Sequence, residues 1–338
     1  SEPDRTSATQ FLKLVRDRDP ARAAILEPLM ADLPDNDAQL ERAIAEMPSV
    51  LGFFVDSEGG GLPAVKAGFA IAGSGEHPST VLPRIDAAVA SLPAFQEAAI
   101  GLGSITLTEN DNDIIRRVPM FHANGEKIYP ALVPEILRVV DGANTIILRT
   151  NLASGEFAAR SVGMTMFKTG QFEAPVDDEG QFLIYYARND RSLYVSARDV
   201  LTMSEEALRP LVEGHIVLLG ASAAGLRAVR VTALGESVPG VFMHVQMLDQ
   251  ILSGQFLSRP DWARGAEEMI MVLLTVLTVL ILPFVGPLLS ALFGLVMAIC
   301  VLAGSWFAFS SWGLLIDPIF PLISGIAIYL LMTSLLFA

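Results

Sequence analysis

The chain has 338 residues, of which 52% are hydrophobic and 18% charged, and its formal net charge is −14; this length allows about two domains. The acidic balance argues against nucleic acid as a partner, because phosphates are bound by basic patches. The single cysteine, Cys300, excludes a disulfide within the chain and any metal site built from several cysteines.

Charge is distributed unevenly along the chain. All 23 Lys and Arg and 34 of the 37 Asp and Glu precede Gly265, so that the first part carries a net charge of −11. We interpret this negative charge as a feature that keeps the first part soluble. The last 74 residues carry only three formal charges: Glu267, Glu268 and Asp317. We therefore predict that the first part is exposed to water and that the second part is surrounded by an apolar medium.

The first predicted helix spans residues 33–47, with Asp35 or Asn36 as its N-cap. The residues expected on its inner face are Leu40, Ile44 and Met47. The apolar run Val50–Val55 follows and is typical of a strand buried on both faces. A helix followed by a buried strand is typical of α/β folds, so we predict a mixed sheet flanked by helices.

The rest of the first part alternates short apolar runs with helical spacings, separated by turn residues. The predicted strands are 67–72, 103–108, 116–121, 167–175, 181–186 and 215–221. The predicted helices are 84–98, interrupted by Pro93, then 130–140, 204–212 and 241–252.

An acidic turn and two arginines are the first candidate ligand-binding residues. Asp111 and Asp113 alternate with asparagines, but the bidentate Glu and central Gly of an EF-hand loop are missing, so a hairpin turn is favoured over a Ca²⁺ site. Arg116 and Arg117 follow directly. An arginine can bind an anionic ligand bidentately or pair with a nearby acid, and we favour pairing. We retain Asp113, Arg116 and Arg117 as candidates, although neighbours on a strand point to opposite faces.

Two further candidates lie near the end of the first part. His244 stands in an otherwise apolar predicted helix, where it can sense pH or a ligand, although a hydrogen-bonded core histidine is the favoured interpretation. Ser222 lies in Gly220–Ala224, which is similar to a nucleophile elbow but has Ala at the fifth position. A tight strand-to-helix crossing explains these small residues better.

No catalytic or metal site is predicted in this chain. No His and acid are placed to complete a triad with Ser222, and the four histidines show no metal-ligand spacing. We therefore expect no cofactor bound by these residues.

Three apolar runs follow Gly265: Met269–Phe284, Pro287–Phe309 and Leu314–Phe337. A bilayer core needs roughly 20 apolar residues as a helix, a length that the first run reaches only with its flanks. We predict three transmembrane helices at about 267–285, 286–309 and 314–337. The predicted domains are thus 1–263 and 264–338, with Asp317 in an interfacial loop.

Seven stretches in the same order carry a resemblance that covers essentially the whole chain. They are Ser1–Ser7, Pro34–Asp37, Asn112–Pro119, Ser196–Leu201, Ile216–Leu226, Val238–His244 and Phe256–Trp262. Together they resemble the second type of CHASE domain, the cyclase/histidine-kinase-associated sensory extracellular domain.

The resemblance implies a topology and a function. In that family a membrane helix precedes an extracytoplasmic sensor, and three membrane helices lead to a cytoplasmic output module. Residues 1–263 would then be the periplasmic or extracellular part of a multi-pass protein of the bacterial cytoplasmic (inner) membrane. An anchor and the first part of the sensor would precede Ser1. The implied partners are the lipid bilayer and an unknown extracytoplasmic ligand or protein.

The opening Ser1–Ser7 resembles members that end in a class III adenylate or guanylate cyclase. Such a module after Ala338 would use Mg and ATP or GTP and act as a homodimer. The alternatives are a histidine or serine/threonine kinase output, or a non-enzymatic membrane subunit or accessory binding protein of a larger complex.

Two features depart from the family pattern or from simple charge rules. Ala228 and Ala233 stand where members have Asp and Pro, so no ligand residue is carried over to this loop. Arg259 and Arg264 flank the first apolar run on the sensor side, which alone would place the sensor in the cytoplasm. We follow the family topology, because the rule weakens beside large domains.

Overall fold

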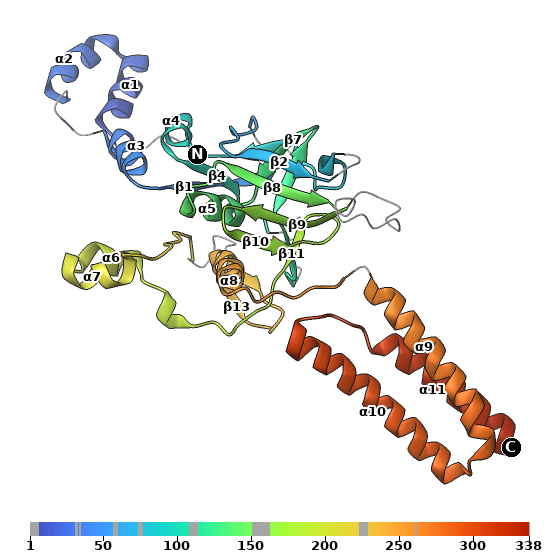
Figure 1. The fold of residues 1–338 in the computed structure, drawn as a ribbon. Coiled ribbons are helices and arrows are strands. Elements are labelled where there is room, and N and C mark those ends of the chain that lie inside the picture. Colours follow the sequence, from blue (N-terminus) through green and yellow to red (C-terminus); the bar gives the residue numbers. More distant parts are fainter. Residues whose placement is uncertain are drawn as a thin grey trace. The chain divides into compact units, whose positions relative to one another are not determined.

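A computed structural model of the chain describes residues 7–30, 33, 35–56, 60–73, 77–107, 114–150, 163–222, 229–260 and 262–337. The chain divides into two compact units, Ser1–Gly254 and Gln255–Ala338. The first unit combines small sheets with helices, and the second consists of apolar helices (Figure 1). The predicted mixed α/β fold of the first part is confirmed.

The first unit opens with three helices, which are α1 (Ala8–Arg18), α2 (Pro20–Met30) and α3 (Asn36–Glu46). α3 begins as predicted, because the Asp35 carboxylate accepts hydrogen bonds from the backbone N–H groups two and three residues later. Of the predicted inner face only Ile44 is buried, whereas Leu40 and Met47 are 50% and 58% exposed. The helix therefore packs through a narrower face than its periodicity predicted.

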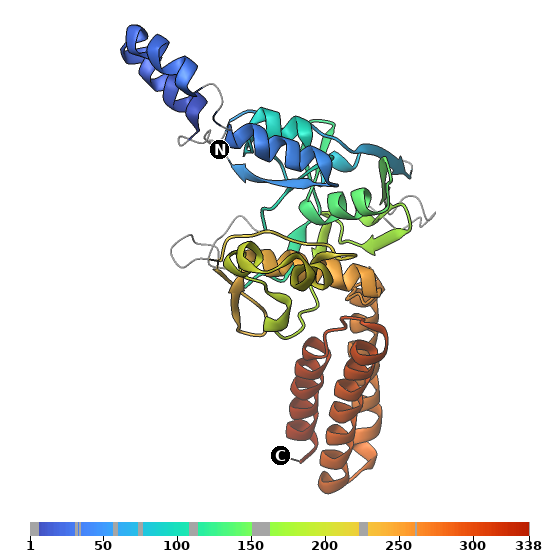
Figure 2. The same cartoon turned by 90° about the vertical axis from the view of Figure 1, so that its left-hand side faces the viewer.

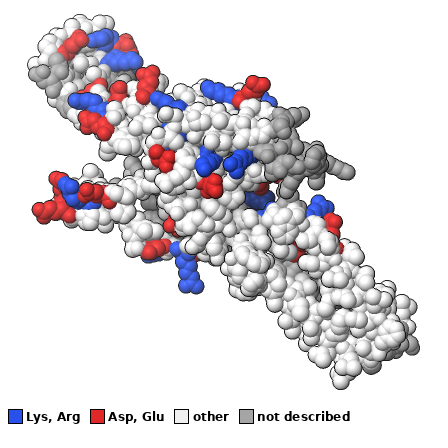
Figure 3. Space-filling model, viewed as in Figure 1, with Lys and Arg blue, Asp and Glu red and all other residues white. Residues whose placement is uncertain are grey.

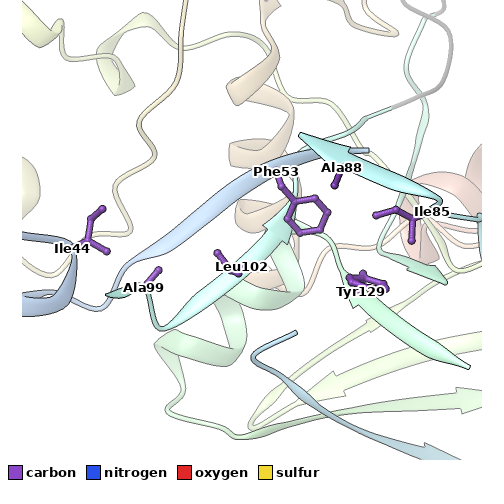
Figure 4. Packing of buried hydrophobic residues seen from close by; sticks show 7 residues of the cluster. All are labelled: Ile44, Phe53, Ile85, Ala88, Ala99, Leu102 and Tyr129. Carbon is purple, nitrogen blue, oxygen red and sulfur yellow. The ribbon is translucent and has the colours of Figure 1, made fainter. Parts of the chain in front are cut away.

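A three-stranded sheet follows, in the order β3 (Ala87–Val89), β1 (Val50–Asp56), β4 (Gly101–Ser104). β1 pairs with β4 in parallel and with β3 antiparallel. Its inner face and neighbouring residues form a hydrophobic core (Figure 4) that contains Ile44, Phe53, Ile85, Ala88, Ala99, Leu102 and Tyr129. The strand predicted at Val50–Val55 is confirmed, but it is buried on one face only, since Phe54 is 54% exposed.

The helix predicted over 84–98 is wrong in its first half. Residues 87–89 form β3, and only α4 (Pro93–Ala98) is helical. Pro93 begins this helix instead of interrupting it, because a proline lacks only a donor that the first helical turn leaves unpaired.

A second sheet has four strands in the order β10 (Phe172–Pro175), β9 (Met164–Thr169), β8 (Thr145–Thr150), β2 (Gly68–Ala72). β2 and β8 are parallel, while β8, β9 and β10 are successively antiparallel. The single strand predicted over 167–175 is in fact the end of β9, a turn and β10. Gly170 makes the turn possible, because its φ of +54° is in the left-handed region.

Shorter elements complete the sheets of the first unit. The two-stranded pairs are β5 (Arg117–Pro119) with β11 (Gln181–Leu183), β6 (Phe121–Asn124) with β7 (Lys127–Pro130), and β12 (Val229–Val231) with β13 (Ser237–Pro239). Two 3₁₀ turns are η1 (Pro78–Thr80) and η3 (Arg191–Leu193).

A buried ion pair fixes α5 (Leu132–Val140) against β4. Glu135 and Arg138, one helical turn apart, are 0% and 5% exposed and join through Arg138 Nη2 and Glu135 Oε1 at 2.7 Å. Arg138 also donates to the carbonyl oxygens of Ala143 and Ile100, at 3.0 and 3.1 Å. Space for the pair depends on Gly101, since a Cβ there would lie 2.7 Å from Glu135 Oε1.

The last third of the first unit contains α6 (Ala197–Thr202), α7 (Glu205–Val212) and α8 (Gly240–Ser253). The helices predicted at 204–212 and 241–252 are confirmed. The strand predicted over 215–221 is wrong, because residues 216–222 have no regular secondary structure. An apolar run alone does not make a strand when no described strand pairs with it.

The second unit contains α9 (Trp262–Ile281), η4 (Leu282–Phe284), α10 (Pro287–Trp312) and α11 (Ile319–Phe337). The helices lie side by side, and α11 packs along both α9 and α10 (Figure 2). Two stretches are long and apolar enough to cross a membrane, Trp262–Phe284 with 23 residues and Leu288–Trp312 with 25. The third helix, α11, has a shorter apolar stretch, which runs over Ile319–Leu335.

The outer surface of this second unit is apolar. Leu288, Trp306, Phe320 and Leu335 are more than two-thirds exposed, and many other large apolar side chains there are more than 40% exposed. Figure 3 shows this surface almost free of charged residues. Such exposure is typical of helices that contact lipid, and it is not the pattern of buried helices in a water-soluble core.

Removing one partner of the Glu135–Arg138 pair should destabilise the first unit strongly. We expect Arg138→Met to lower its free energy of unfolding by about 3–5 kcal/mol, because Glu135 would remain as an uncompensated buried charge. The measurement is urea unfolding of the detergent-solubilised chain, followed by circular dichroism.

The matched control is Arg209→Met, which removes an exposed arginine that pairs with Glu205 at 2.7 Å on α7. This change should cost about 0–1 kcal/mol, as exposed pairs do. Equal effects of the two substitutions would contradict a special role for the buried pair.

Candidate functional site

α8 is the last element of the first unit and is buried over most of its surface. Phe242, Met243 and Met247 are at most 2% exposed. The helix ends at Gly254, whose φ of +67° forms a left-handed cap, and the chain then enters the second unit. The chain that leaves α8 therefore runs directly on toward α9.

Two glutamines one helical turn apart on α8 hold an extended segment that continues β11. Gln250 accepts a hydrogen bond from the backbone N–H of Tyr185 at 3.0 Å and donates to the carbonyl oxygen of Leu183 at 3.1 Å. Gln246 accepts from the backbone N–H of Ala187 at 2.7 Å. The two amides replace a neighbouring strand, so residues 183–187 are fixed to α8 without a ladder.

The arginine-bearing strand is connected to the same segment. The backbone N–H of Ile184 donates to the carbonyl oxygen of Arg116 at 2.9 Å. The Tyr186 hydroxyl donates to the carbonyl oxygen of Ile115 at 2.9 Å and lies 2.9 Å from Met243 Sδ on α8. Burial raises the pKa of Tyr186, which keeps its hydroxyl a donor. β5, residues 183–187 and α8 thus form one packed assembly, which we call the α8 assembly.

The two candidate arginines differ in their surroundings. Arg116 is exposed. Arg117 pairs with Asp177 at 3.5 Å, which agrees with the pairing favoured from the sequence. Burial raises the pKa of Asp177, and this effect is opposed by the backbone N–H of Gln181 and by Arg117. Asp113, the third candidate in this region, lies outside the described residues.

His244 is a buried histidine on α8, 4% exposed, and its ring hydrogen-bonds to the backbone of Ile105. Its Nδ1 atom has no hydrogen-bond partner in the described structure, and neither has Nδ1 of His122 on β6, which is 3% exposed. Burial lowers the pKa of each residue from 6.5 to about 4, so both rings are neutral at pH 7.

Ser222 is not part of this assembly. Its side chain is exposed at the end of the irregular stretch 216–222, and the residues that follow it, 223–228, lie outside the described part of the chain. In the described ranges no group of three or more His, Cys, Asp or Glu side chains could hold a metal ion.

Sequence reasoning missed the residues that organise the α8 assembly. Gln246 and Gln250 stand four residues apart in an apolar helix, which is a readable signal, since buried amides need partners. Their partners were not predictable, because they are backbone groups about 60 residues earlier in the chain. Tyr186 gave no comparable signal.

Comparison with known proteins gives one kind of match. The profile of the CHASE2 domain matches residues 2–282, which includes the first unit and α9. No curated protein and no solved structure matches the chain. The resemblance inferred from seven short stretches of sequence is therefore confirmed at the level of the family.

The two buried histidines predict how stability depends on pH. Because their pKa is about 4 in the folded state and 6.5 in an unfolded peptide, the unfolded chain binds protons first as the pH falls. Their contribution is complete above about pH 6.5 and is lost between there and about pH 4, by up to about 3 kcal/mol per residue. We expect His122→Leu to reduce this loss, measured as the urea midpoint at several pH values.

The control is His215→Leu, at an exposed position. This variant should retain the pH dependence of the wild type. A His122→Leu variant whose urea midpoint falls with pH as steeply as that of the wild type would contradict the prediction.

Proposed function

The chain belongs to the CHASE2 domain family, sensory extracellular domains found with cyclases and kinases, and we propose that it is the sensing and membrane-spanning part of a receptor. One observation carries this proposal. The family match runs from the first unit through α9, so a sensory domain and a candidate membrane helix form one continuous family segment.

A bilayer around the second unit is supported by the side chains at one end of it. All three tryptophans of the chain lie at the start of α9 or in the last turns of α10: Trp262, Trp306 and Trp312. They are 56%, 69% and 65% exposed. Tryptophan is enriched at the membrane–water interface, so this end would lie at the level of the headgroups.

We propose that α11 crosses the bilayer as well. Its 19 residues span about 28 Å as a helix, close to the roughly 30 Å of a bilayer core. Slight thinning of the bilayer accommodates such a difference. Three crossings would place the first unit and Ala338 on opposite sides, with the first unit periplasmic or extracellular at a bacterial inner membrane.

The output that we propose is a class III adenylate or guanylate cyclase module after Ala338. Its support is the resemblance of Ser1–Ser7 to cyclase-bearing members. Such a module would bind Mg and ATP or GTP and would require a homodimer. An extracytoplasmic ligand would change its activity by binding two states of the sensor with different affinity.

We place the signal input at the α8 assembly. It carries the predicted residues Arg116, Arg117 and His244, and α8 leads directly into the second unit. Asp113 and Ser222 remain predictions from the sequence alone.

The three-crossing topology can be tested by labelling single cysteines, because Cys300 is the only natural one. In a Cys300→Ser background, Phe284→Cys and Ala338→Cys should react with an impermeant maleimide from the same side of sealed vesicles. Ser192→Cys, in the first unit, should react from the opposite side. Reaction of Ala338→Cys from the side of Ser192→Cys would show that α11 does not cross.

The cyclase proposal is tested on the complete gene product in vesicles. With Mg present, we expect formation of cyclic AMP from ATP or cyclic GMP from GTP. Phosphate transfer to protein would indicate a kinase output instead, and no reaction with either nucleotide would favour a non-enzymatic subunit. Neither of these results would affect the assignment to the sensory family.

A further inference from the structure

The segment that enters the second unit does not lead to α9 alone. Before α9 begins, the backbone N–H of Ser258 donates to the carbonyl oxygen of Gly313 at 3.0 Å, and the Ser258 carbonyl oxygen accepts from the N–H of Leu315 at 2.9 Å. Residues 313–315 belong to the loop between α10 and α11. The incoming chain therefore pairs with that loop like a short parallel strand.

Gly313 makes this approach possible in two ways. Its φ of +64° caps α10 in the left-handed region, where a side chain is strained. A Cβ at this position would also overlap the carbonyl oxygen of Phe256. Backbone atoms cannot yield as a flexible side chain can, so any larger residue must push the incoming segment away from the loop.

Glu267 joins the same parts through its carboxylate. It lies on α9, its side chain is 9% exposed, and Oε2 accepts from Arg259 Nη2 at 2.9 Å. Its other oxygen, Oε1, accepts from the backbone N–H of Asp317 at 2.7 Å. A carboxylate shielded from water forms strong charge-assisted hydrogen bonds, so the two contacts hold α9 to the incoming segment and to the loop.

The loop is in turn fixed to both neighbouring helices. Asp317 Oδ1 accepts from the N–H of Ile319 at 2.8 Å and so caps α11. Ser305 on α10 donates through its hydroxyl to the carbonyl oxygen of Ile316 at 2.7 Å. Contacts between residues 256–259, Glu267 and the loop 313–317 thus connect three helix ends, and we call them the clasp.

We propose that the clasp holds the sensor-side ends of α9, α10 and α11 as one body, so that movement of the incoming chain reaches all three helices together. The proposal rests on the proposed function, because it assumes that movement of the sensor is the signal. Without the clasp, a displaced α8 would pull on α9 alone. With it, the two strand-like hydrogen bonds at Ser258 transmit the displacement to α10 and α11 as well.

The test measures two properties of the full chain in lipid nanodiscs. Spin labels at Arg264→Cys on α9 and Phe320→Cys on α11, in a Cys300→Ser background, should give one narrow distance distribution. Gly313→Val should broaden it. In the same variant the amide hydrogens of Leu315 and Asp317 should exchange about tenfold faster or more, because their acceptors are displaced.

Two matched controls isolate the clasp. Gly304→Val makes the same change within α10, where an added Cβ meets nothing within 4 Å, and should leave both readings unchanged. Should Gly313→Val fail to insert, Glu267→Leu removes both carboxylate contacts. Its control is Glu268→Leu, because the Glu268 side chain is 63% exposed.

The proposal is overturned if Gly313→Val and Glu267→Leu leave the distance distribution as narrow as in the wild type, since packing between α9 and α11 would then suffice. A broad distribution in the wild type would overturn it equally. Neither reading depends on nucleotide turnover. If the clasp behaves as expected but the complete protein shows no cyclase activity, only the cyclase output is disproved.

Discussion

The first unit depends on one pair of opposite charges placed away from water. Glu135 and Arg138 each lose their hydration, and the loss is offset because nearly every polar atom of the pair has a fixed partner. Those partners lie on strand β4, on the residue before that strand and in the turn after α5. A purely apolar contact would let the helix slide along the strand, whereas these hydrogen bonds define a single position. The sheet that contains β1 and the helix that covers it are therefore placed relative to each other by polar geometry as well as by packing.

The sequence predicted those elements whose signals are local. The N-cap of α3, the helix at α5 and the long apolar runs of the second unit were all identified, because caps, periodicity and hydrophobic length act within a few residues. Strands were predicted less well. β8 was not predicted, 167–175 was taken as one strand, and 215–221 has no regular structure, because pairing partners are distant in the sequence.

The candidate site shows the same limit. His244, Arg116 and Arg117 could be chosen from residue type alone, but the backbone partners of the glutamines that join their elements could not be predicted. Gln250 interacts with backbone groups of Leu183 and Tyr185, which no pattern in the chain points to. In both units buried polar side chains, Gln246 and Gln250 in the first and Glu267 in the second, satisfy backbone groups of segments outside their own helix. Breaking such a contact leaves an unpaired group in an apolar surrounding, so these positions resist gradual deformation.

The placement of the indole rings has a practical consequence. Because the first unit contains no tryptophan, the tryptophan emission of this chain, excited selectively over that of tyrosine, comes entirely from one end of the apolar helices. Its wavelength and its quenching by brominated lipids would report the depth of that end in the bilayer without any added dye. Binding events confined to the sensory domain would be silent in this signal, so a spectral change on adding a ligand would itself be evidence that the effect had travelled to the membrane.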